Sequence, residues 1–411
     1  MSRKQHSHLG ASATRTSATS TNDQPDAATP LDRRSFVRGA AAAAVAGAGT
    51  GLACRSEQSA PAVHTRQRVR WRLTSSFPRG LDLLYGINDR LAERLEQLSG
   101  GMFQLRAYPA GELVPGLQVL DAVQQSTVEV GHTASYYYTG KNPAFAFEIG
   151  MPFGLMASQQ LGWLYRGGGL ELMREVLADF NAITFPAGTT GSQMGGWFRR
   201  EVNSLDDLQG LKMRIPGLGG EVMSRLGVTV QVIAGGDVYP ALERGAIDAT
   251  EWAGPYDDEQ LGFHEIVKNY YYPCWWEPGP VLSFYVNRDR WDELSPEYQA
   301  MFESATTEVA ARMTSSYEAL TPPALQRLLA TGVQLRPFSI DVLDAAYDRS
   351  FELFEEHAAA DAGYRKIYQA WSAACQGSFH WYGSSARAYA DFVLSRSDTG
   401  EGNRFAGSAA S

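Results

Sequence analysis

The stretch KMRIPGLGGEVMSRLGVTVQVIAGGDVYPALERGAIDATEW, residues 212–252, predicts two short strand–helix units in succession. Arg214 stands at the end of the first predicted strand, and the pair Glu251 and Trp252 follows the last one. Open α/β sheets bind their ligands at the ends of strands. We therefore expect this stretch to form half of a closing pocket for a small organic anion.

The rest of the chain shows the same alternation of strands and helices. Alternating apolar and polar residues predict strands over 69–75, 103–108, 128–133, 183–187, 194–198, 267–272 and 281–287. Helical spacing of apolar residues predicts helices over 81–98, 117–125 and 157–180, and a nearly continuous helical pattern from 295 to 396. This order predicts a mostly parallel sheet with covering helices.

These patterns also predict a division of the chain. We expect a signal segment over 1–54, a linker over 55–67, a first lobe over 68–188, a second lobe over 189–280, a return strand to the first lobe with C-terminal helices over 281–396, and a disordered tail over 397–411. The C-terminal helices have a clear start, because Ser295 is a suitable cap and Pro296 suits the first helical position.

The composition is that of a folded protein. Of the 411 residues, 44% are hydrophobic, 20% charged and 11% aromatic, which is enough for a sizeable core. The formal net charge of −9 argues against nucleic acid and against an anionic membrane surface as the main partner. The three cysteines, Cys54, Cys274 and Cys375, form neither a CxxC pair nor a zinc pattern.

The N-terminal segment resembles a twin-arginine (Tat) export signal. Arg33 and Arg34 are followed by Phe36 and by a mildly apolar Ala/Gly run over 39–53. That run is shorter than the roughly 20 apolar residues that a membrane span needs. The sequence GLAC that ends in Cys54 partly resembles a lipobox, which leaves open lipidation of Cys54 or its removal. In both cases we expect the mature chain to be periplasmic.

Polar residues near the predicted strand ends are the candidates for binding. Arg214 is either a structural ion pair or a ligand clamp, because a guanidinium matches a carboxylate with paired N–H donors. Glu251, beside Trp252, is either part of a pocket wall or an exposed acid in a loop. Gln193 follows a Gly/Thr-rich turn and carries little signal by itself. Most of the bulky aromatic residues are expected to pack in the core.

Two short patterns resemble enzyme motifs but lack the context that those motifs need. Tyr137 and Lys141 have the spacing of the catalytic pair of short-chain dehydrogenases, but SSFPRG at 75–80 is not a Gly-rich dinucleotide turn. The glycines at 217–220 are followed by Val222 where a dinucleotide turn has a glycine. The sequence contains no GxSxG, HExxH or P-loop motif. We therefore expect that the chain is not an enzyme.

Several segments together resemble a known family of transport proteins. They are GSQMGGWF at 191–198, SLDDLQGLKMRIPG at 204–217, GGDVYPALERGAIDATEW at 235–252, GPYDD at 254–258 and YYYPCWWEPG at 270–279. These segments resemble the DctP-type solute-binding subunit of TRAP transporters, and within it the branch that binds 2-oxo acids. The resemblance covers roughly residues 69–390 and is densest over 188–290.

The resemblance implies an α/β, two-lobed fold like that of periplasmic binding proteins, with a ligand cleft between the lobes and long C-terminal helices. It implies that Arg214 clamps the carboxylate of the substrate. Glu277 matches a position that faces the ligand, and Tyr137 and Tyr138 match the contacts from the first lobe.

The same branch holds a cation, usually Na⁺, next to the substrate. The matching positions are Gln193 through its side-chain oxygen, Glu251 through its carboxylate and Trp252 through its backbone carbonyl, so Gln193 and Glu251 also border the substrate. Oxygen ligands suit Na⁺ or Ca²⁺ rather than zinc. The charges of Arg214, Glu251, a monocarboxylate and Na⁺ cancel, whereas an ionised Glu277 would favour Ca²⁺.

The predicted function is to capture a 2-oxo acid such as pyruvate with a cation and to deliver it to the permease subunits in the membrane. We expect the lobes to close on hinges near 186–190 and 278–283. The alternatives are a binding protein for lactate, other hydroxy acids or sugar acids, a Tat-exported enzyme acting on small carboxylates, and a ligand sensor. In some relatives a C-terminal helix swaps between subunits, and residues 351–368 permit such a homodimer as well as packing within one chain.

Overall fold

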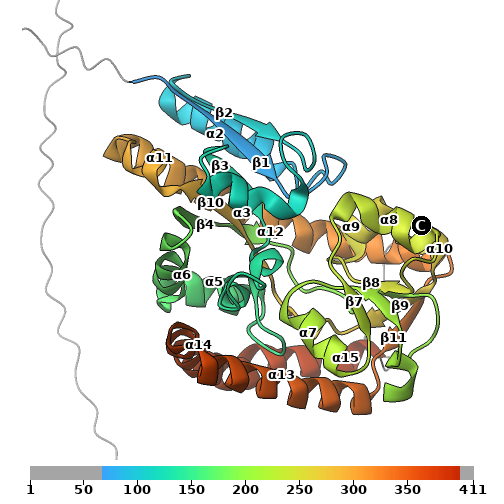
Figure 1. The fold of residues 1–411 in the computed structure, drawn as a ribbon. Coiled ribbons are helices and arrows are strands. Elements are labelled where there is room, and N and C mark those ends of the chain that lie inside the picture. Colours follow the sequence, from blue (N-terminus) through green and yellow to red (C-terminus); the bar gives the residue numbers. More distant parts are fainter. Residues whose placement is uncertain (1–66, 399–411) are drawn as a thin grey trace, which may run out of the picture. The chain divides into compact units, whose positions relative to one another are not determined.

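A computed structural model of the protein describes residues 67–398 (Figure 1). The predicted signal segment over 1–54, with Cys54, and nearly all of the linker over 55–67 lie outside the described residues, as does most of the predicted tail over 397–411. Among the described residues, no helix combines the length and the apolar character that crossing a membrane requires.

The first lobe is built on a sheet of five strands in the order β2-β1-β3-β10-β4. The strands are β1 (Val69–Ser75), β2 (Phe103–Tyr108), β3 (Val130–Thr133), β4 (Ala182–Thr189) and β10 (Val281–Asn287). β1 is parallel to β2 and β3, whereas β10 is antiparallel to β3 and β4. Residues 281–287 therefore pair with strands that precede residue 190 in the chain.

Seven helical segments belong to the first lobe. They are α2 (Ile87–Ser99), η1 (Gly116–Gln118), α3 (Val119–Gln124), η2 (Ser135–Tyr138), α4 (Phe145–Ile149), α5 (Ala157–Arg166) and α6 (Gly169–Ala178). In α2, buried Ile87, Leu91 and Leu95 recur on one face, and Gly100 ends the helix in the left-handed region with φ 64°. The helix begins six residues later than predicted, because residues 82–86 form turns.

The second lobe is built on a sheet of six strands in the order β11-β9-β5-β8-β6-β7. The strands are β5 (Trp197–Phe198), β6 (Lys212–Arg214), β7 (Thr229–Gln231), β8 (Ala249–Thr250), β9 (Asn269–Tyr272) and β11 (Gln334–Pro337). Its helical segments are η3 (Leu205–Leu208), α7 (Gly217–Arg225), α8 (Gly235–Glu243), α9 (Pro255–Leu261) and α10 (Phe263–Ile266). β6 is parallel to both β7 and β8, as two successive strand–helix units predict.

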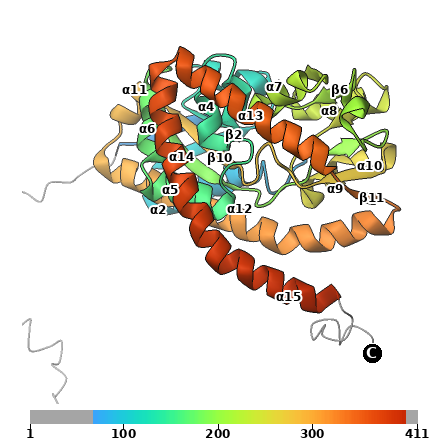
Figure 2. The same cartoon turned by 90° about the horizontal axis from the view of Figure 1, so that it is seen from below.

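Long helices make up most of the chain after β10. They are α11 (Arg288–Asp292), α12 (Pro296–Ala330), α13 (Ile340–Ala360), α14 (Ala362–Tyr382), the π-helical turn η4 (Gly383–Arg387) and α15 (Ala388–Asp398). Ser295 caps α12, as predicted, by accepting a hydrogen bond from the Tyr298 amide. α12 packs against α2 and β4 of the first lobe and against α9 of the second, so it spans both lobes (Figure 2).

The predicted amphipathic segment 351–368 is divided between two helices. α13 ends at Ala360, and Asp361 caps α14 by accepting a hydrogen bond of 2.6 Å from the Tyr364 amide. Phe354 and Tyr364 are buried, and α13 packs against α14. The two parts of this segment therefore pack against each other across the break at Asp361.

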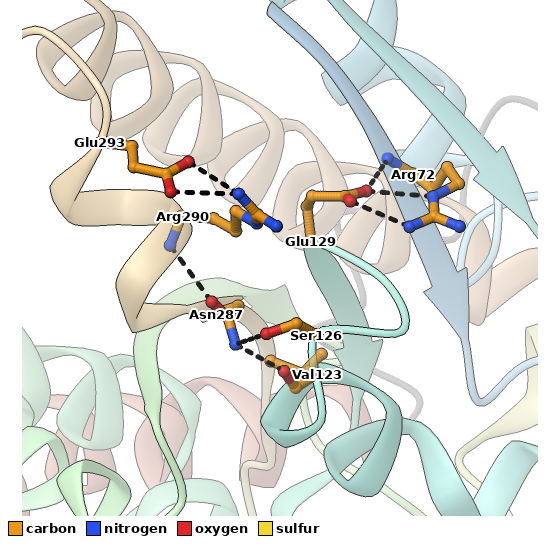
Figure 3. A network of polar contacts seen from close by, with 7 residues as sticks. All are labelled: Arg72, Val123, Ser126, Glu129, Asn287, Arg290 and Glu293. Atoms are coloured by element: carbon orange, nitrogen blue, oxygen red, sulfur yellow. Dashed lines mark hydrogen bonds and ion pairs between the residues drawn. The ribbon is translucent and has the colours of Figure 1, made fainter.

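A polar network at the far end of β10 anchors that strand in the first lobe (Figure 3). Asn287 donates from Nδ2 to the Val123 carbonyl oxygen at 2.8 Å and to Ser126 Oγ at 3.1 Å. Its Oδ1 accepts from the Arg290 amide at 3.1 Å and so caps α11. Because Asn287 is fully buried and bonded through both polar atoms of its side chain, it ties the end of β10 to residues 123–126 and to α11.

Candidate ligand-binding site

Arg214, at the end of β6, is the centre of the site. β6 and β8 are parallel with Arg214 opposite Thr250, so the residue after β8, Glu251, comes next to the guanidinium. Arg214 donates from Nη1 to the Glu251 carboxylate and to its carbonyl oxygen, from Nε to the Ile233 carbonyl oxygen, and from Nη2 to Tyr137 Oη. A guanidinium has five N–H donors, and four have acceptors among the described residues. One N–H of Nη2 is left for a ligand.

Two buried carboxyl groups lie beside this arginine. Glu251 is 1% exposed and Glu277 is 3% exposed. Burial raises the pKa of Glu251, although Arg214 opposes this, and burial together with the neighbouring Glu251 carboxylate raises the pKa of Glu277 well above its usual range. The site therefore holds more acidic groups than its one arginine can neutralise.

Several buried oxygen atoms of the site have no hydrogen-bond donor among the described residues unless Glu277 is protonated, in which case its carboxyl group can donate to Glu251. They are Gln193 Oε1, Glu251 Oε2, and both carboxyl oxygens of Glu277. The Gln193 amide nitrogen donates to Thr190 Oγ1 at 2.8 Å, which leaves its oxygen free. Buried acceptors without donors are costly. A group of oxygens of this kind fits a hard cation such as Na⁺ or Ca²⁺.

Trp252 contributes both its ring and its backbone. The Arg214 guanidinium lies over the indole ring, 5.2 Å from the centroid. No protein donor to the Trp252 carbonyl oxygen is found within residues 67–398. Arg214, Glu251, Trp252 and Glu277 thus lie together, and the backbone next to Gln193 is bonded to Ala253 beside Trp252.

The first lobe contributes Tyr137 and a residue that the sequence analysis missed, Tyr136. Tyr137 Oη is 3.3 Å from Arg214 Nη2, and the rings of Tyr136 and Tyr137 are 4.7 Å apart. Tyr136 also meets α7, because a Cβ atom added at Gly217 would lie 2.8 Å from the Tyr136 Cβ. Burial raises the pKa of the Tyr136 hydroxyl. The charged groups of Glu277, Glu251 and Arg214 also act on this pKa, so they lie near the hydroxyl. Tyr136 is therefore a wall of the same site.

Tyr138, which the resemblance placed among the substrate contacts, lies elsewhere. Its hydroxyl is bonded to the Leu120 amide at 3.1 Å and to Thr133 Oγ1 at 2.9 Å, and its ring packs against Phe145 and Tyr285. These are core residues of the first lobe. The structure therefore brings Tyr137 to Arg214 and directs Tyr138 away from it.

Comparisons with known proteins place this site in context. Residues 80–361 match the family described as bacterial extracellular solute-binding protein, family 7 (DctP). The chain is 51% identical over 354 residues to the monocarboxylate 2-oxoacid-binding periplasmic protein of Nostoc sp., with 86% of this chain and 97% of the relative covered.

Two solved structures are also similar. A TRAP transporter solute-binding protein from Bordetella bronchiseptica is 43% identical, with a TM-score of 0.80 and coverage of 82% of this chain and 100% of the other. That structure is a mixed-occupancy dimer with calcium and picolinate in one active site. A TRAP periplasmic solute-binding protein from Pseudoalteromonas atlantica, 36% identical with a TM-score of 0.77, covers 79% of this chain and 99% of the other and holds sodium and pyruvate.

Proposed function

The chain belongs to family 7 of the bacterial extracellular solute-binding proteins, the DctP family of TRAP transporter subunits, and on this premise we propose that it captures a 2-oxo acid of the size of pyruvate together with a cation. Proteins of this family bind solutes for transport and are not enzymes. The proposal includes delivery of the ligand to the permease subunits in the membrane.

One observation carries this proposal. Among the described residues, buried Arg214 keeps one N–H free beside the two acids Glu251 and Glu277, and the Gln193 side-chain oxygen is buried without a donor. A carboxylate that accepts from Arg214 would bring a negative charge close to Glu251, and a cation between them would balance these two charges. The names of the Nostoc and Pseudoalteromonas proteins support a 2-oxo acid as that carboxylate.

Charge balance relates the choice of cation to Glu277. With a protonated Glu277, the charges of Arg214, Glu251, a monocarboxylate and Na⁺ cancel. With an ionised Glu277, Ca²⁺ gives the neutral site. We propose Na⁺ as the cation and Ca²⁺ as the alternative, with Gln193, Glu251 and the Trp252 carbonyl as the ligands.

Closure of the lobes is the proposed mechanism of capture. Arg214 and Gly217 of the second lobe meet Tyr137 and Tyr136 of the first. The proposed hinges at 186–190 and 278–283 lie at the ends of β4 and β10 that face away from Asn287, and the pairing of β4 and β10 is irregular between Leu282 and Ser283. Closure would exclude water and strengthen each ionic contact in the site.

Export and assembly complete the proposal. Proteins of the family work outside the cytoplasm, and the Arg33–Arg34 pair supports export by the twin-arginine route, with or without lipidation of Cys54.

A homodimer through α14 and α15 is also proposed. Large apolar side chains are exposed on these helices, and exposed apolar surface is typical of interaction sites. They are Trp381, Tyr389, Phe392 and Leu394, which are 61–72% exposed. Light scattering of the mature protein with and without residues 383–411 tests the dimer.

The ligand class is tested by calorimetric titration of the mature protein with pyruvate, 2-oxobutyrate, lactate and gluconate in the presence of Na⁺ or Ca²⁺. We expect saturable binding of the 2-oxo acids. If a folded protein binds lactate or gluconate but no 2-oxo acid, the proposed ligand class is wrong. NMR spectra of the same mixtures over hours test the enzyme alternative, since the bound acid should remain chemically unchanged. Genes for membrane permease subunits beside the gene would argue against a sensor.

A further inference from the structure

A buried aspartate outside the predicted set of ligands lies directly behind the proposed cation site. Asp258, on α9, is 1% exposed. Its Oδ2 accepts hydrogen bonds from Trp197 Nε1 at 2.9 Å and from Tyr270 Oη at 2.6 Å, and the rings of Trp197 and Tyr270 stack with centroids 3.9 Å apart. Trp197 is on β5 and Tyr270 on β9, so this oxygen is fixed by two strands of the second sheet.

The other oxygen of this carboxylate holds the loop that carries the proposed ligands. Asp258 Oδ1 accepts from the Ala253 amide at 3.3 Å. The Ala253 N–H and the Trp252 carbonyl belong to one planar trans peptide unit, in which they point in opposite directions. An acceptor that fixes the direction of this N–H therefore also fixes the direction of the Trp252 carbonyl.

Ala253 also connects this loop to the segment that carries Gln193. The Ala253 carbonyl oxygen accepts from the Met194 amide at 3.0 Å, next to Gln193 in the chain. Glu251 is held by a separate hydrogen bond, in which its backbone amide donates to the Arg214 carbonyl oxygen at 3.2 Å. Ala253 is thus bonded on one side to Asp258 and on the other to the segment of Gln193, so two of the three proposed cation ligands depend on its position.

From these contacts we infer that Asp258 is a positioning residue for the cation: it orients the peptide unit of Trp252 and Ala253 and thereby sets the ligand geometry. The inference rests on the proposed function. The negative charge of Asp258 raises the pKa of Glu251, so in the absence of a cation it disfavours the ionised form of Glu251. Residues that orient metal ligands from behind typically change metal affinity by about 10- to 100-fold when they are replaced.

Asp258→Asn tests this role with little change in volume. The Trp197 N–H can only donate, so the amide oxygen of the new side chain is expected to stay on Trp197 and its NH₂ group to face the Ala253 N–H. The matched control is Asp257→Asn. Asp257 is the preceding residue and is fully buried, but its carboxylate accepts from Tyr317 Oη on α12 at 2.7 Å and does not contact the loop.

The experiment measures pyruvate binding by calorimetry at a series of Ca²⁺ and of Na⁺ concentrations for the wild type and both variants. For Asp258→Asn we expect the cation concentration at half-maximal binding to rise at least about 10-fold, while pyruvate affinity at saturating cation changes by less than about 3-fold. Asp257→Asn should keep the wild-type midpoint. If Asp258 only stabilised the fold, the cation midpoint should change by the same factor in both variants. The affinity for pyruvate at saturating cation should then fall as well.

The outcomes distinguish this inference from the proposed function. Suppose that the wild type needs a cation, but that the cation midpoint is unchanged in Asp258→Asn or changes equally in Asp257→Asn. This result would overturn only the role of Asp258. A wild type that binds pyruvate without a cation would overturn the cation site itself. If Asp258→Asn does not fold, Trp197→Phe replaces it, because this change removes one of the two donors that hold Asp258 Oδ2. A rise in the cation midpoint is expected there too, and an unchanged midpoint would overturn the role.

Discussion

At the scale of single residues, the site depends on how one buried arginine is neutralised. Arg214 is fully buried, and an unpaired charge there would cost several kcal/mol. Burial acts to lower its pKa, but the Glu251 carboxylate and the neighbouring tyrosines outweigh burial and raise it above its usual value. The guanidinium therefore stays charged when the lobes are closed, and it remains available to a carboxylate.

Arg214→Ala should abolish detectable ligand binding, with Kd rising at least about 30-fold, because truncating one partner of a buried hydrogen-bonded charge pair costs about 2–5 kcal/mol. Calorimetric titration with pyruvate measures the effect. The control is Arg200→Ala, which removes an exposed arginine of the same lobe and should leave Kd unchanged. Wild-type affinity in the Arg214 variant would contradict the assignment of the site.

Asp257 predicts how stability depends on pH. Burial raises its pKa to about 7, against the opposing hydrogen bond from Tyr317, whereas its ordinary value is 3.8. The folded protein therefore holds this proton more tightly than the unfolded chain. The stabilisation is complete below about pH 4 and is lost as pH rises through 7, by up to about 4 kcal/mol.

Urea unfolding of the wild type and of Asp257→Asn at pH 5 and pH 8 measures this effect. The free energy of unfolding of the wild type should fall relative to that of the variant as pH rises. A difference between the two proteins that stays constant with pH would show that Asp257 does not carry the proton.

Sequence patterns singled out Arg214 and Glu251, whereas Gln193, Glu277 and the tyrosines were proposed from the family resemblance alone. Arg214 and Glu251 stand at strand ends, where the parallel register of β6 and β8 brings them together. Three successive tyrosines, in contrast, contain no pattern that indicates which of them faces the site. They form η2, a 3₁₀ turn with three residues per turn, so each side chain points in a different direction. Packing alone decides that Tyr136 and Tyr137 face the site while Tyr138 enters the core.

At the scale of elements, the contact between β4 and α12 fixes the frame on which the lobes move. Gly188, in β4, has φ 126°, and a Cβ atom there would lie 2.9 Å from Met313 Sδ and 3.1 Å from the Ala310 carbonyl oxygen of α12. The helix and the strand therefore approach each other at a distance that only glycine permits. This close contact lies within the proposed hinge at 186–190.

Gly188→Ala should lower the free energy of unfolding by about 1–3 kcal/mol, because the new methyl group meets α12 and the backbone conformation disfavours a side chain. Denaturant unfolding measures the change. The control is Gly162→Ala in α5, where a Cβ atom has free space and a helical glycine is replaced, so stability should rise by about 0.5–1 kcal/mol. Equal stability of the Gly188 variant and the wild type would contradict the close contact.

The strands and helices predicted from the sequence were mostly confirmed, since period-2 and helical patterns follow burial on one face. β1 and β10 have the predicted bounds, 69–75 and 281–287. β11 was missed, because it has only four residues and three of them are exposed, so its side chains show no apolar alternation. It exists through pairing with β9, from which it is separated by the whole of α12.

At the scale of the whole molecule, the two lobes are joined at their rim as well as at the site. Asp82, which follows β1 in the first lobe, accepts hydrogen bonds from Tyr256 Oη at 2.9 Å and from Gln260 Nε2 at 3.1 Å, both on α9 of the second lobe. Burial and the Asp82 carboxylate raise the pKa of Tyr256 to about 12, so its hydroxyl remains a donor. These bonds join the two lobes, so the proposed opening of the lobes would break them.

Asp82→Ala should speed ligand dissociation by about 2- to 5-fold, since exposed polar contacts contribute about 0.5–1 kcal/mol. The association rate should stay unchanged, because the open form does not use these bonds. Stopped-flow fluorescence measures both rates. Asp89→Ala, which changes an exposed aspartate of α2, is the control. A dissociation rate equal to that of the wild type would show that the rim contact does not hold the lobes together.

The most direct test of the central claim is a pyruvate titration of the mature protein, followed by tryptophan fluorescence, first in a chelated buffer free of Na⁺ and then with Na⁺ or Ca²⁺ added. Trp252 lies in the site and should report closure. We predict a saturable change that requires one of the two cations, and a cation requirement at least about 10-fold higher in Glu251→Gln, which removes a proposed ligand charge. Equal pyruvate affinity with and without cations, or an unchanged cation requirement in the variant, would contradict joint capture of acid and cation.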